Sequence, residues 1–361
     1  TLSSSDVFSE IERLWISSLH PWDALVCTSN AGKHVVESVF HNVHEHLQKR
    51  FDTKLPFPSG AQLPVIPLGC LDAFEGDSRT RKSRRAAARA QLEIDYSSLV
   101  ILFLGRLSFH SKAHPLPLYH ALSRLTRDFP DRRIMLLECG HIYSDPIHSA
   151  FIELQDLFPY LCIKRLGGLT PATENQKKLA LAAADVFVSL ADNIQETFGL
   201  SVIEAMSASL PTIVSDWNGY KDLVENGVSG FLIPTEMVVD ESGHHDHIDS
   251  NYALGTMSYD VMVGLRSMTT IVSHHALYRS LKLFLEFPDL SFQMGHLSRL
   301  RWKYFFSWQT VHQQYLQLWN ELALLRRHHS DSSVDSIIPT PLFPSFSNYP
   351  SRAFNVFSIV R

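Results

Sequence analysis

Two carboxylates in the middle of the chain have the residue type and spacing for sugar chemistry. Glu196 opens the stretch ETFGL at 196–200, and Glu204 follows eight positions later. Eight residues make about 2.2 helical turns, so a helix that begins at Leu200 turns Glu204 to a side near Glu196. Carboxylates accept hydrogen bonds from sugar hydroxyls, while Gly199 and the unpaired N–H groups of a first helical turn can approach an anion.

Two cations lie upstream at the end of a predicted strand. Apolar residues at 99–104 lead directly into Gly105 and Arg106, and Lys112 follows on the same loop. A guanidinium fork and an ammonium group suit a diphosphate. Because open α/β sheets bind ligands at the carboxyl ends of their strands, we expect both cations and both carboxylates to meet in one crevice. The four residues together predict a nucleotide-sugar pocket.

The elements that must hold these residues alternate between strand and helix. Apolar segments separated by helix-length connections predict a parallel sheet covered on both faces, which is a doubly wound, Rossmann-like domain. We expect strands at 99–104, 134–139, 161–166, 186–190, 212–215 and 231–233. Helices are expected at 117–127, 176–183, 200–208 and 220–224.

The flanking regions have other patterns. A strand at 23–29, a helix at 31–50 and a proline-rich strand segment at 63–68 precede the sheet. The basic run RTRKSRR at 79–85 is interpreted as the start of a solvated helix, not a nucleic-acid patch. Helices are expected at 277–287 and 294–325, with the aromatic residues of the second packed in the core. That second segment is rich in Trp302, Tyr304, Phe305, Trp308, Tyr315 and Trp319.

Composition excludes several classes of protein. The chain has 361 residues, 45% of them hydrophobic and 19% charged, which excludes a disordered, collagen-like or coiled-coil protein. A formal charge of -5 argues against nucleic acid as a partner. Four widely spaced cysteines and the absence of a long apolar run predict a soluble protein of the cytoplasm.

The motifs resemble those of retaining glycosyltransferase family 4, which has the GT-B fold. GRL at 105–107 with Lys112, and ETFGLSVIE at 196–204, are similar to its diphosphate-binding and E-x7-E signatures. The similarity covers roughly residues 20–235. It implies transfer of a sugar from a nucleoside diphosphate to an acceptor with retention of anomeric configuration, without a metal or other cofactor.

The resemblance also implies residue roles. Arg106 and Lys112 would neutralise the donor diphosphate and stabilise the leaving group, and Glu196 would hold hydroxyls of the donor sugar. Glu204 would hold the ribose hydroxyls. The remaining donor-binding positions are Gly105, Thr197, Phe198, Gly199 and Leu200.

Two positions depart from the family pattern. Lys112 is followed by Ala113 where the family often has glycine, which puts the reach of the lysine in doubt. Ser209 replaces a helix-ending glycine, so this serine is expected in the left-handed conformation at a cost of about 1 kcal/mol.

The resemblance implies that the chain is organised in four regions. Residues 1–90 are expected to be a partial acceptor-side domain and 91–290 a donor domain with an insertion at 236–275. Residues 291–328 are expected to form helices that pack back on the N-terminal part, and 329–361 a flexible tail. Most of the acceptor domain is expected upstream or on another polypeptide, and peripheral membrane contact through it stays open.

Several alternatives stay open. The acceptor is a glycan, a lipid or a small molecule; the chain is alternatively an inactive nucleotide-sugar-binding scaffold, or an epimerase on the same fold. Asn193 and Gln195 either touch the donor or cap their loop. Trp217 and Tyr220 either line the crevice or pack beneath it. The histidine run at 243–249 is interpreted as a flexible loop, with no metal site.

Overall fold

A six-stranded parallel sheet forms the centre of the computed structural model, which describes residues 2–57, 60–237 and 247–328. The strand order is β3-β2-β1-β4-β5-β6, so the order changes direction between β1 and β4. The strands are β1 (Leu99–Arg106), β2 (Ile134–His141), β3 (Cys162–Gly168), β4 (Val186–Ser189), β5 (Thr212–Ser215) and β6 (Gly230–Ile233). All six predicted strands are confirmed, with small shifts at their ends.

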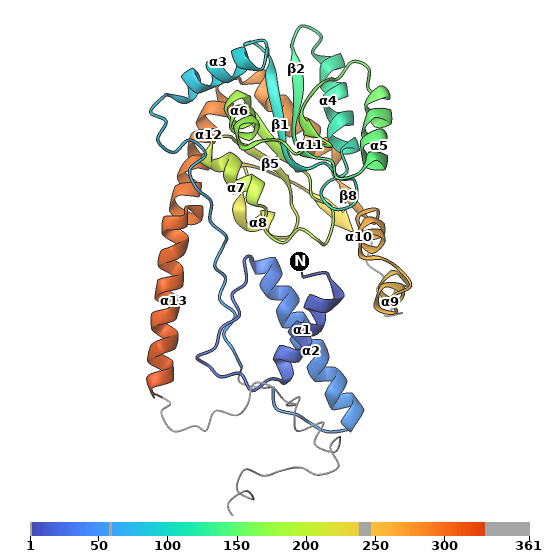
Figure 1. Ribbon diagram of the computed structural model, residues 1–361, viewed down its shortest axis with the longest axis vertical. Helices are drawn as coiled ribbons and strands as arrows, with labels where there is room; N and C mark the ends of the chain where they lie inside the picture. The colour runs from blue at the N-terminus through green and yellow to red at the C-terminus, as the bar shows by residue number, and fades with distance from the viewer. Residues whose placement is uncertain (1, 58–59, 238–246, 329–361) are drawn as a thin grey trace, which may run out of the picture.

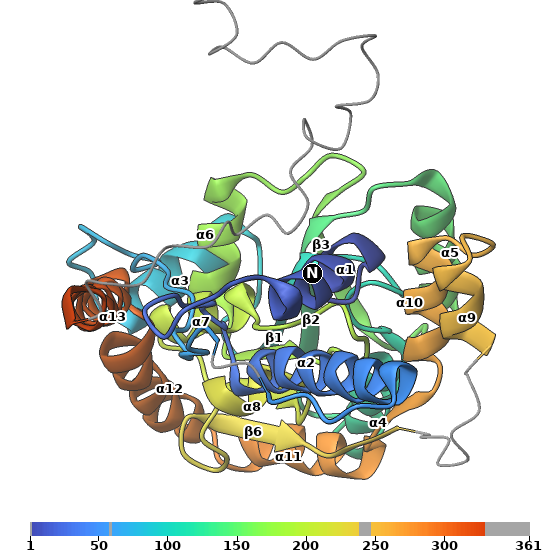
Figure 2. The same cartoon turned by 90° about the horizontal axis from the view of Figure 1, so that it is seen from below.

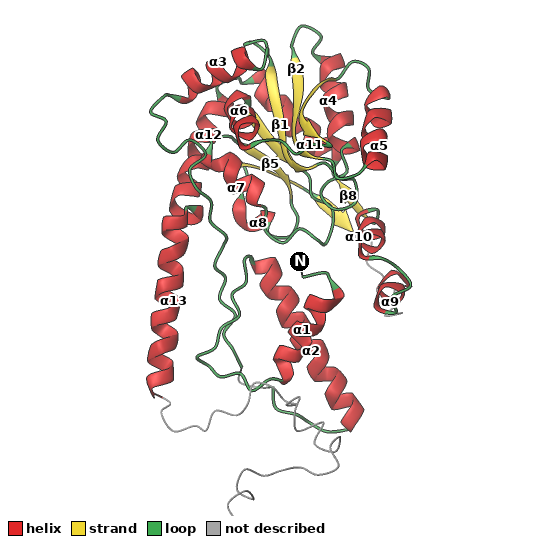
Figure 3. Ribbon diagram, viewed as in Figure 1, coloured by secondary structure: helices red, strands yellow, loops and turns green. Residues whose placement is uncertain are grey.

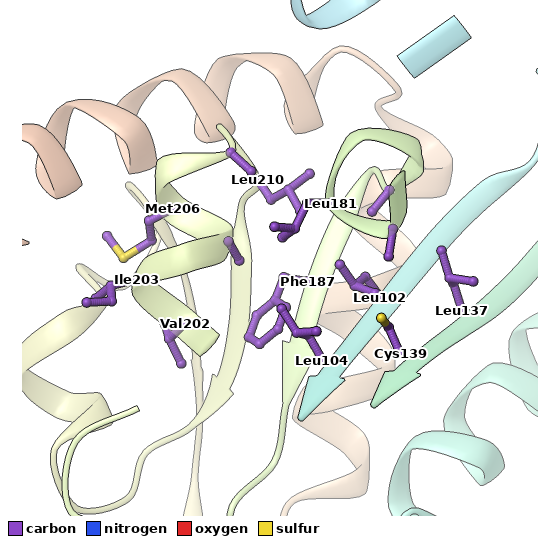
Figure 4. Close-up of a cluster of buried hydrophobic side chains, with 14 of the residues drawn as sticks. Leu102, Leu104, Leu137, Cys139, Leu181, Phe187, Val202, Ile203, Met206 and Leu210 are labelled. Carbon is purple, nitrogen blue, oxygen red and sulfur yellow. The ribbon is translucent and has the colours of Figure 1, made fainter. Parts of the chain in front are cut away.

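Alternation along each strand divides the core between the two faces of the sheet. Leu102 and Leu104 of β1 point to one face, where they pack with Phe187 and Leu181 (Figure 4), whereas Ile101 points to the other. The first face is covered by α3 (Arg81–Gln91), α6 (Glu174–Ala183), α7 (Leu200–Ser207) and α8 (Tyr220–Leu223). The second is covered by α4 (Leu116–Asp128) and α11 (His274–Glu286), giving three layers (Figure 3). Helix α5 (Asp145–Asp156), which connects β2 to β3, was not predicted.

The helix α3 corrects the interpretation of the basic run. Arg85 and Arg89 are buried, with 9% and 1% of their surface exposed. The Asp185 carboxylate accepts from Arg85 Nε at 2.7 Å and from Arg89 Nη2 at 2.6 Å. Arg85, the last residue of the run, and Arg89 beyond it are therefore internal residues of the sheet unit (residues 81–301), where Asp185 from a distant part of the chain balances their charge.

The N-terminal unit (residues 2–68) lies beyond the carboxyl ends of the strands (Figures 1 and 2). It contains α1 (Ser5–Ile16), which was not predicted, and α2 (Asn30–Phe51), which confirms the predicted helix. The strand expected at 23–29 is wrong as a regular strand: it forms an extended pair with the proline-rich segment, held by the parallel bridges Ala24–Gln62 and Cys27–Val65. Prolines in the second segment remove N–H donors and shorten the ladder.

The C-terminal helices connect the two units. The predicted single helix is wrong: α12 (Leu290–Arg301) continues as a π-helical turn η1 (Trp302–Phe306), and α13 (Trp308–His328) starts after an extended Ser307. The break lets α13 run alongside the N-terminal unit (Figure 1), where Val311 and Leu318 pack with Ile66. Helix α13 thus packs on the N-terminal part of the chain.

The chain passes between the two units twice, and the break places these two crossings side by side. Cys70 N donates to Phe306 O at 3.0 Å, and Trp302 Nε1 donates to Cys70 Sγ at 3.1 Å. The Trp308 ring lies on Gly69, where an added Cβ would lie 2.8 Å from it. We call these contacts between 69–75 and 302–308 the spine.

The aromatic residues around the break are only partly in the core. Trp302 and Phe306 are buried against the sheet unit, as predicted. The prediction is wrong for four others, which expose about half of their surface or more: two lie on η1, and two lie on α13, of which the extended pair covers only one side. They are Tyr304 at 64%, Phe305 at 50%, Trp308 at 48% and Trp319 at 56% exposed.

The predicted insertion is partly regular. It holds β7 (Thr235–Met237), α9 (His247–Ala253), α10 (Tyr259–Ser267) and β8 (Thr270–Val272), with β7 and β8 antiparallel. Its helices reach the N-terminal unit, since Tyr252 Oη accepts from Ser5 N at 2.9 Å. Most of the histidine run, and the whole of 329–361, lie outside the described residues. Across the described ranges, every helix is too short or too polar to traverse a lipid bilayer.

Candidate functional site

The change of direction in strand order brings two loops together. The basic loop (residues 105–115) leaves the carboxyl end of β1, and the acidic loop (residues 192–200) follows β4, its neighbour in the sheet. Lys112 Nζ donates to Glu196 Oε2 at 2.5 Å, and Arg106 Nη2 donates to Gln195 Oε1 at 3.4 Å. The structure therefore brings Lys112 to the first carboxylate, whereas Arg106 reaches the neighbouring amide of Gln195.

The second carboxylate lies in a neighbouring cleft. Glu204 is on α7, and its Oε1 accepts from Lys177 Nζ of α6 at 2.6 Å. The cleft has a volume of about 670 Å³ and is lined by residues 68–75, by α6 and α7, and by Trp308. Leu200 lines it and joins it to the acidic loop. Glu204 is thus paired with Lys177, while the predicted cation Lys112 is paired with Glu196.

Lys177 is a residue of the site that sequence reasoning missed. Its helix was predicted, but no motif marked the lysine as a partner for Glu204. Burial is the largest single influence on the pKa of Lys177 and lowers it. The hydrogen bond and the charge of Glu204 act in the opposite direction, and the pKa is raised overall. The ammonium therefore stays charged and holds the carboxylate in the cleft.

The turn into α7 needs glycine at position 199. Gly199 has φ of 114°, and an added Cβ would lie 2.3 Å from Tyr220 Cε1. Tyr220 is fully buried beneath the loop, and its hydroxyl shares a hydrogen bond of 2.9 Å with Ser189 Oγ. Burial, followed by the charge of Glu196, raises the pKa of Tyr220. Of the alternatives left open for Tyr220, packing beneath the crevice is the one observed.

Loop capping is likewise observed for Asn193. Its Nδ2 donates to Lys112 O at 2.7 Å, and its Oδ1 accepts from Gln195 N at 3.0 Å. The indole of Trp217 donates to Asn193 O at 2.8 Å, so this ring also packs on the loop. Asn193 has 0% of its surface exposed.

Asp192 is a buried carboxyl that sequence reasoning did not single out. It is 6% exposed, and its Oδ2 accepts from His114 N at 3.2 Å. Its Oδ1 is buried and has no hydrogen-bond partner among the described residues. Burial raises the pKa of Asp192 to about 7 and lowers the pKa of His114. Both groups therefore favour their neutral forms beneath the site.

The N-terminal unit closes on the acidic loop through the first residues of α2. Ser29 Oγ donates to Thr197 O at 2.8 Å. The backbone N and the Nδ2 of Asn30 donate to the two oxygens of Asp222, at 2.7 and 3.0 Å. We call these contacts the latch; no sequence pattern linked residues so far apart.

The structure describes both positions that depart from the family pattern. Ser209 has φ of 65°, which confirms the expected left-handed conformation. Its carbonyl abuts α12, since a Cβ at Gly295 would lie 2.1 Å from Ser209 O. Ala113 is buried at 8% exposure between Lys112 and His114. Within residues 2–57, 60–237 and 247–328, no three acidic, histidine or cysteine side chains are grouped to hold a metal ion.

Solved structures identify the class of fold. A glycosyltransferase from Rickettsia africae superposes with a TM-score of 0.58 at 16% identity, over 87% of this chain and 67% of that one. HepE of Anabaena, in complex with UDP, gives a TM-score of 0.55 at 16% identity, over 83% of this chain and 64% of that one. The protein has the α/β GT-B-like fold of these glycosyltransferases, as predicted.

Sequence comparison adds a likeness in the middle of the chain. Residues 84–243 match the family model "Glycosyl transferases group 1". A D-inositol 3-phosphate glycosyltransferase of Corynebacterium kroppenstedtii is 26% identical over 243 residues, 66% of this chain and 49% of the relative. Another, of Saccharomonospora viridis, is 32% identical over 160 residues, 44% of this chain and 36% of the relative. The matched chain spans half or less of the length of these relatives.

Proposed function

We propose that this chain carries the donor half of a family 4 glycosyltransferase, which transfers a sugar from a nucleoside diphosphate with retention of anomeric configuration. The contact between Lys112 and Glu196 carries the proposal. It joins a cation suited to a diphosphate and a carboxylate suited to a sugar hydroxyl at the carboxyl ends of adjacent strands. This is the edge of an open α/β sheet where ligands bind.

In the proposed complex, the donor exchanges the internal ion pairs for contacts of its own. The diphosphate takes Glu196's place as the partner of Lys112 and draws Arg106 from Gln195, so that Glu196 turns to the hydroxyls of the sugar. Both cations then stabilise the charge that develops on the leaving diphosphate. The backbone of Gly105 and of 197–200 lines the phosphate and sugar.

The cleft beside α7 would receive the nucleoside. Glu204 would accept from the ribose hydroxyls, and Lys177 would keep its carboxylate ionised and in place. A volume of about 670 Å³ falls in the range of small-molecule sites, roughly 300–1,000 Å³. The UDP bound to HepE, a protein of the same fold, supports a nucleoside diphosphate as the ligand.

The transfer itself needs no side-chain base in this proposal. The bond between the anomeric carbon and the phosphate oxygen breaks, and the acceptor oxygen attacks that carbon from the same face of the sugar. The departing phosphate oxygen takes the proton of the acceptor hydroxyl. The acceptor would approach from the N-terminal unit, which faces the acidic loop through the latch. We propose no cofactor, and a glycan, lipid or small molecule as acceptor; the named relatives act on an inositol phosphate.

Nucleotide-dependent stabilisation tests the proposed function. Wild-type protein and Glu204→Gln are heated with UDP-, GDP- and ADP-sugars, and with the free diphosphates. A true donor at 100 times its Kd adds about 2.7 kcal/mol of stability, and the variant should lose most of it. Glu153→Ala, an exposed change on α5, should respond as the wild type does.

The anomeric outcome needs a second experiment. With a donor identified, proton NMR of the product should show the same anomeric configuration as the donor. Binding without transfer to any acceptor would favour the inactive scaffold instead. A wild-type protein that no nucleotide or nucleotide sugar stabilises would overturn the proposal.

A further inference from the structure

Two adjacent side chains of the acidic loop grip the basic loop on either side of Ala113. Asn193 Nδ2 donates to Lys112 O at 2.7 Å, and Asp192 Oδ2 accepts from His114 N at 3.2 Å. One bond takes a carbonyl and the other an N–H, so both peptide groups that flank Ala113 are fixed. The two residues thereby set the direction in which the Lys112 side chain leaves the backbone.

Neither gripping side chain can reach a bound donor. Asn193 has 0% and Asp192 has 6% of its surface exposed. The side chain of Lys112 is 28% exposed and extends to Glu196. Any effect of the buried pair on donor binding must therefore pass through the loop that they hold.

Asn193 is itself held in place by Trp217, and it also bonds to Gln195, the residue that contacts Arg106. Its carbonyl accepts from Trp217 Nε1 at 2.8 Å, which anchors it on the sheet side. Its Oδ1 accepts from Gln195 N at 3.0 Å, and Gln195 Oε1 in turn accepts from Arg106. One buried amide therefore connects the backbone of Lys112 with the residue that holds Arg106.

We propose that Asp192 and Asn193 form a clamp that positions Lys112, and through Gln195 Arg106, for the donor diphosphate. This inference rests on the proposed function. A loop ordered before the donor arrives spends less conformational entropy on binding, so the clamp strengthens binding without touching the ligand. The clamp residues are positioning residues; the phosphate contacts belong to the two cations.

An isosteric change isolates one arm of the clamp. Asn193→Asp keeps Oδ1 for Gln195 N but replaces the donor that faces Lys112 O with an acceptor. UDP and GDP are titrated calorimetrically into wild type, Asn193→Asp, Lys112→Ala and the double variant. The matched control is Asn226→Asp, in the turn before β6, where Asn226 Oδ1 also accepts a backbone N–H.

The double-mutant cycle separates positioning from a general structural effect. We expect Asn193→Asp and Lys112→Ala each to weaken binding about tenfold, the scale of one hydrogen bond to a charged group. The double variant should bind no more than about twofold weaker than Lys112→Ala, because the arm acts through that lysine. Asn226→Asp should bind as the wild type does.

A second pair of variants tests the other arm and covers a failure of Asn193→Asp to fold. Asp192→Ala removes the acceptor for His114 N and should weaken binding about tenfold. Asp192→Asn retains an oxygen acceptor and should restore wild-type affinity. A protein that has merely lost packing would not be rescued by this isosteric change.

Distinct outcomes overturn the clamp and the proposed function. Unchanged affinity in Asn193→Asp and Asp192→Ala, or an equal loss in the presence and absence of Lys112, would overturn the clamp alone. Failure of every nucleotide and nucleotide sugar to bind the wild type would overturn the proposed function, and the clamp with it.

Discussion

Asp192→Asn is expected to stabilise the protein at neutral and alkaline pH. The unfolded carboxyl has a pKa near 3.8, and burial raises the folded pKa of Asp192 to about 7. Between these values the folded state holds a proton that the unfolded state has released. Stability from this group is therefore fully present below pH 3.8 and declines until the pH passes about 7.

The size of the effect follows from the two pKa values. A difference of about three pKa units corresponds to about 4 kcal/mol of unfolding free energy at pH 8, at 1.36 kcal/mol per unit. Roughly 2 kcal/mol of that is already lost at pH 5. Asparagine carries no titrating proton and keeps an acceptor for His114 N. The variant should therefore exceed the wild type by about 2 kcal/mol at pH 5 and about 4 kcal/mol at pH 8.

Neighbouring titratable groups do not obscure this difference. His114 and Tyr220 are neutral through most of the range, because burial lowers the pKa of the first and raises that of the second. Lys112 and Glu196 form an ion pair. All four groups are present in both proteins, so their contributions cancel in the comparison.

Urea unfolding followed by tryptophan fluorescence at pH 5, 6, 7 and 8 measures the effect. Asp156→Asn, at the exposed end of α5, serves as the control and should change the free energy of unfolding by less than about 0.5 kcal/mol. A variant that is less stable than the wild type by the same amount at every pH would refute the reasoning. That result would mean that Asp192 is ionised without penalty.

Three further predictions concern the frame around the site. Asp185→Asn should lower the free energy of unfolding by about 3–5 kcal/mol in urea, because it leaves two buried guanidinium groups without their charge partner. Ser209→Gly should raise it by up to about 1 kcal/mol in the same assay, since φ of 65° suits glycine; a loss would show that the serine side chain has a stabilising contact. Asn30→Ala removes one of two bonds to Asp222 of α8 and should increase the rate of amide exchange in α8, measured by hydrogen–deuterium exchange, with unchanged global stability. Equal protection of α8 in both proteins would rule out the Asn30 side chain as a restraint on that helix.

The sheet and its loops were predictable because local patterns determine them. Apolar segments separated by helix-length connections marked β1 to β6. The spacing of Glu196 and Glu204 correctly placed one on a loop and the other on the following helix. In each case, the information lies within a few residues of the element itself.

Contacts between distant parts of the chain were not predictable in the same way. The run around Arg85 looks solvated until Asp185 is folded against it, and Lys177 carries no mark of its pairing with Glu204. Helical periodicity continues through Ser307, so the break is visible only where Cys70 meets Phe306. The sequence pattern likewise cannot reveal which side of α13 is covered.

The spine limits how the two halves of the molecule can move. Both covalent crossings run through it, and the bonds of Cys70 to Phe306 and Trp302 tie one crossing to the other. Two chain segments that are bonded to each other on one side of the molecule act as a hinge. We expect the halves to move by swinging about this line, because twisting or sliding would break the bonds that hold the two crossings together. Opening would separate Ser5 from Tyr252 of α9, the helix that lies on the other side of the molecule from α13 (Figure 1), before it disturbed the interior of either half.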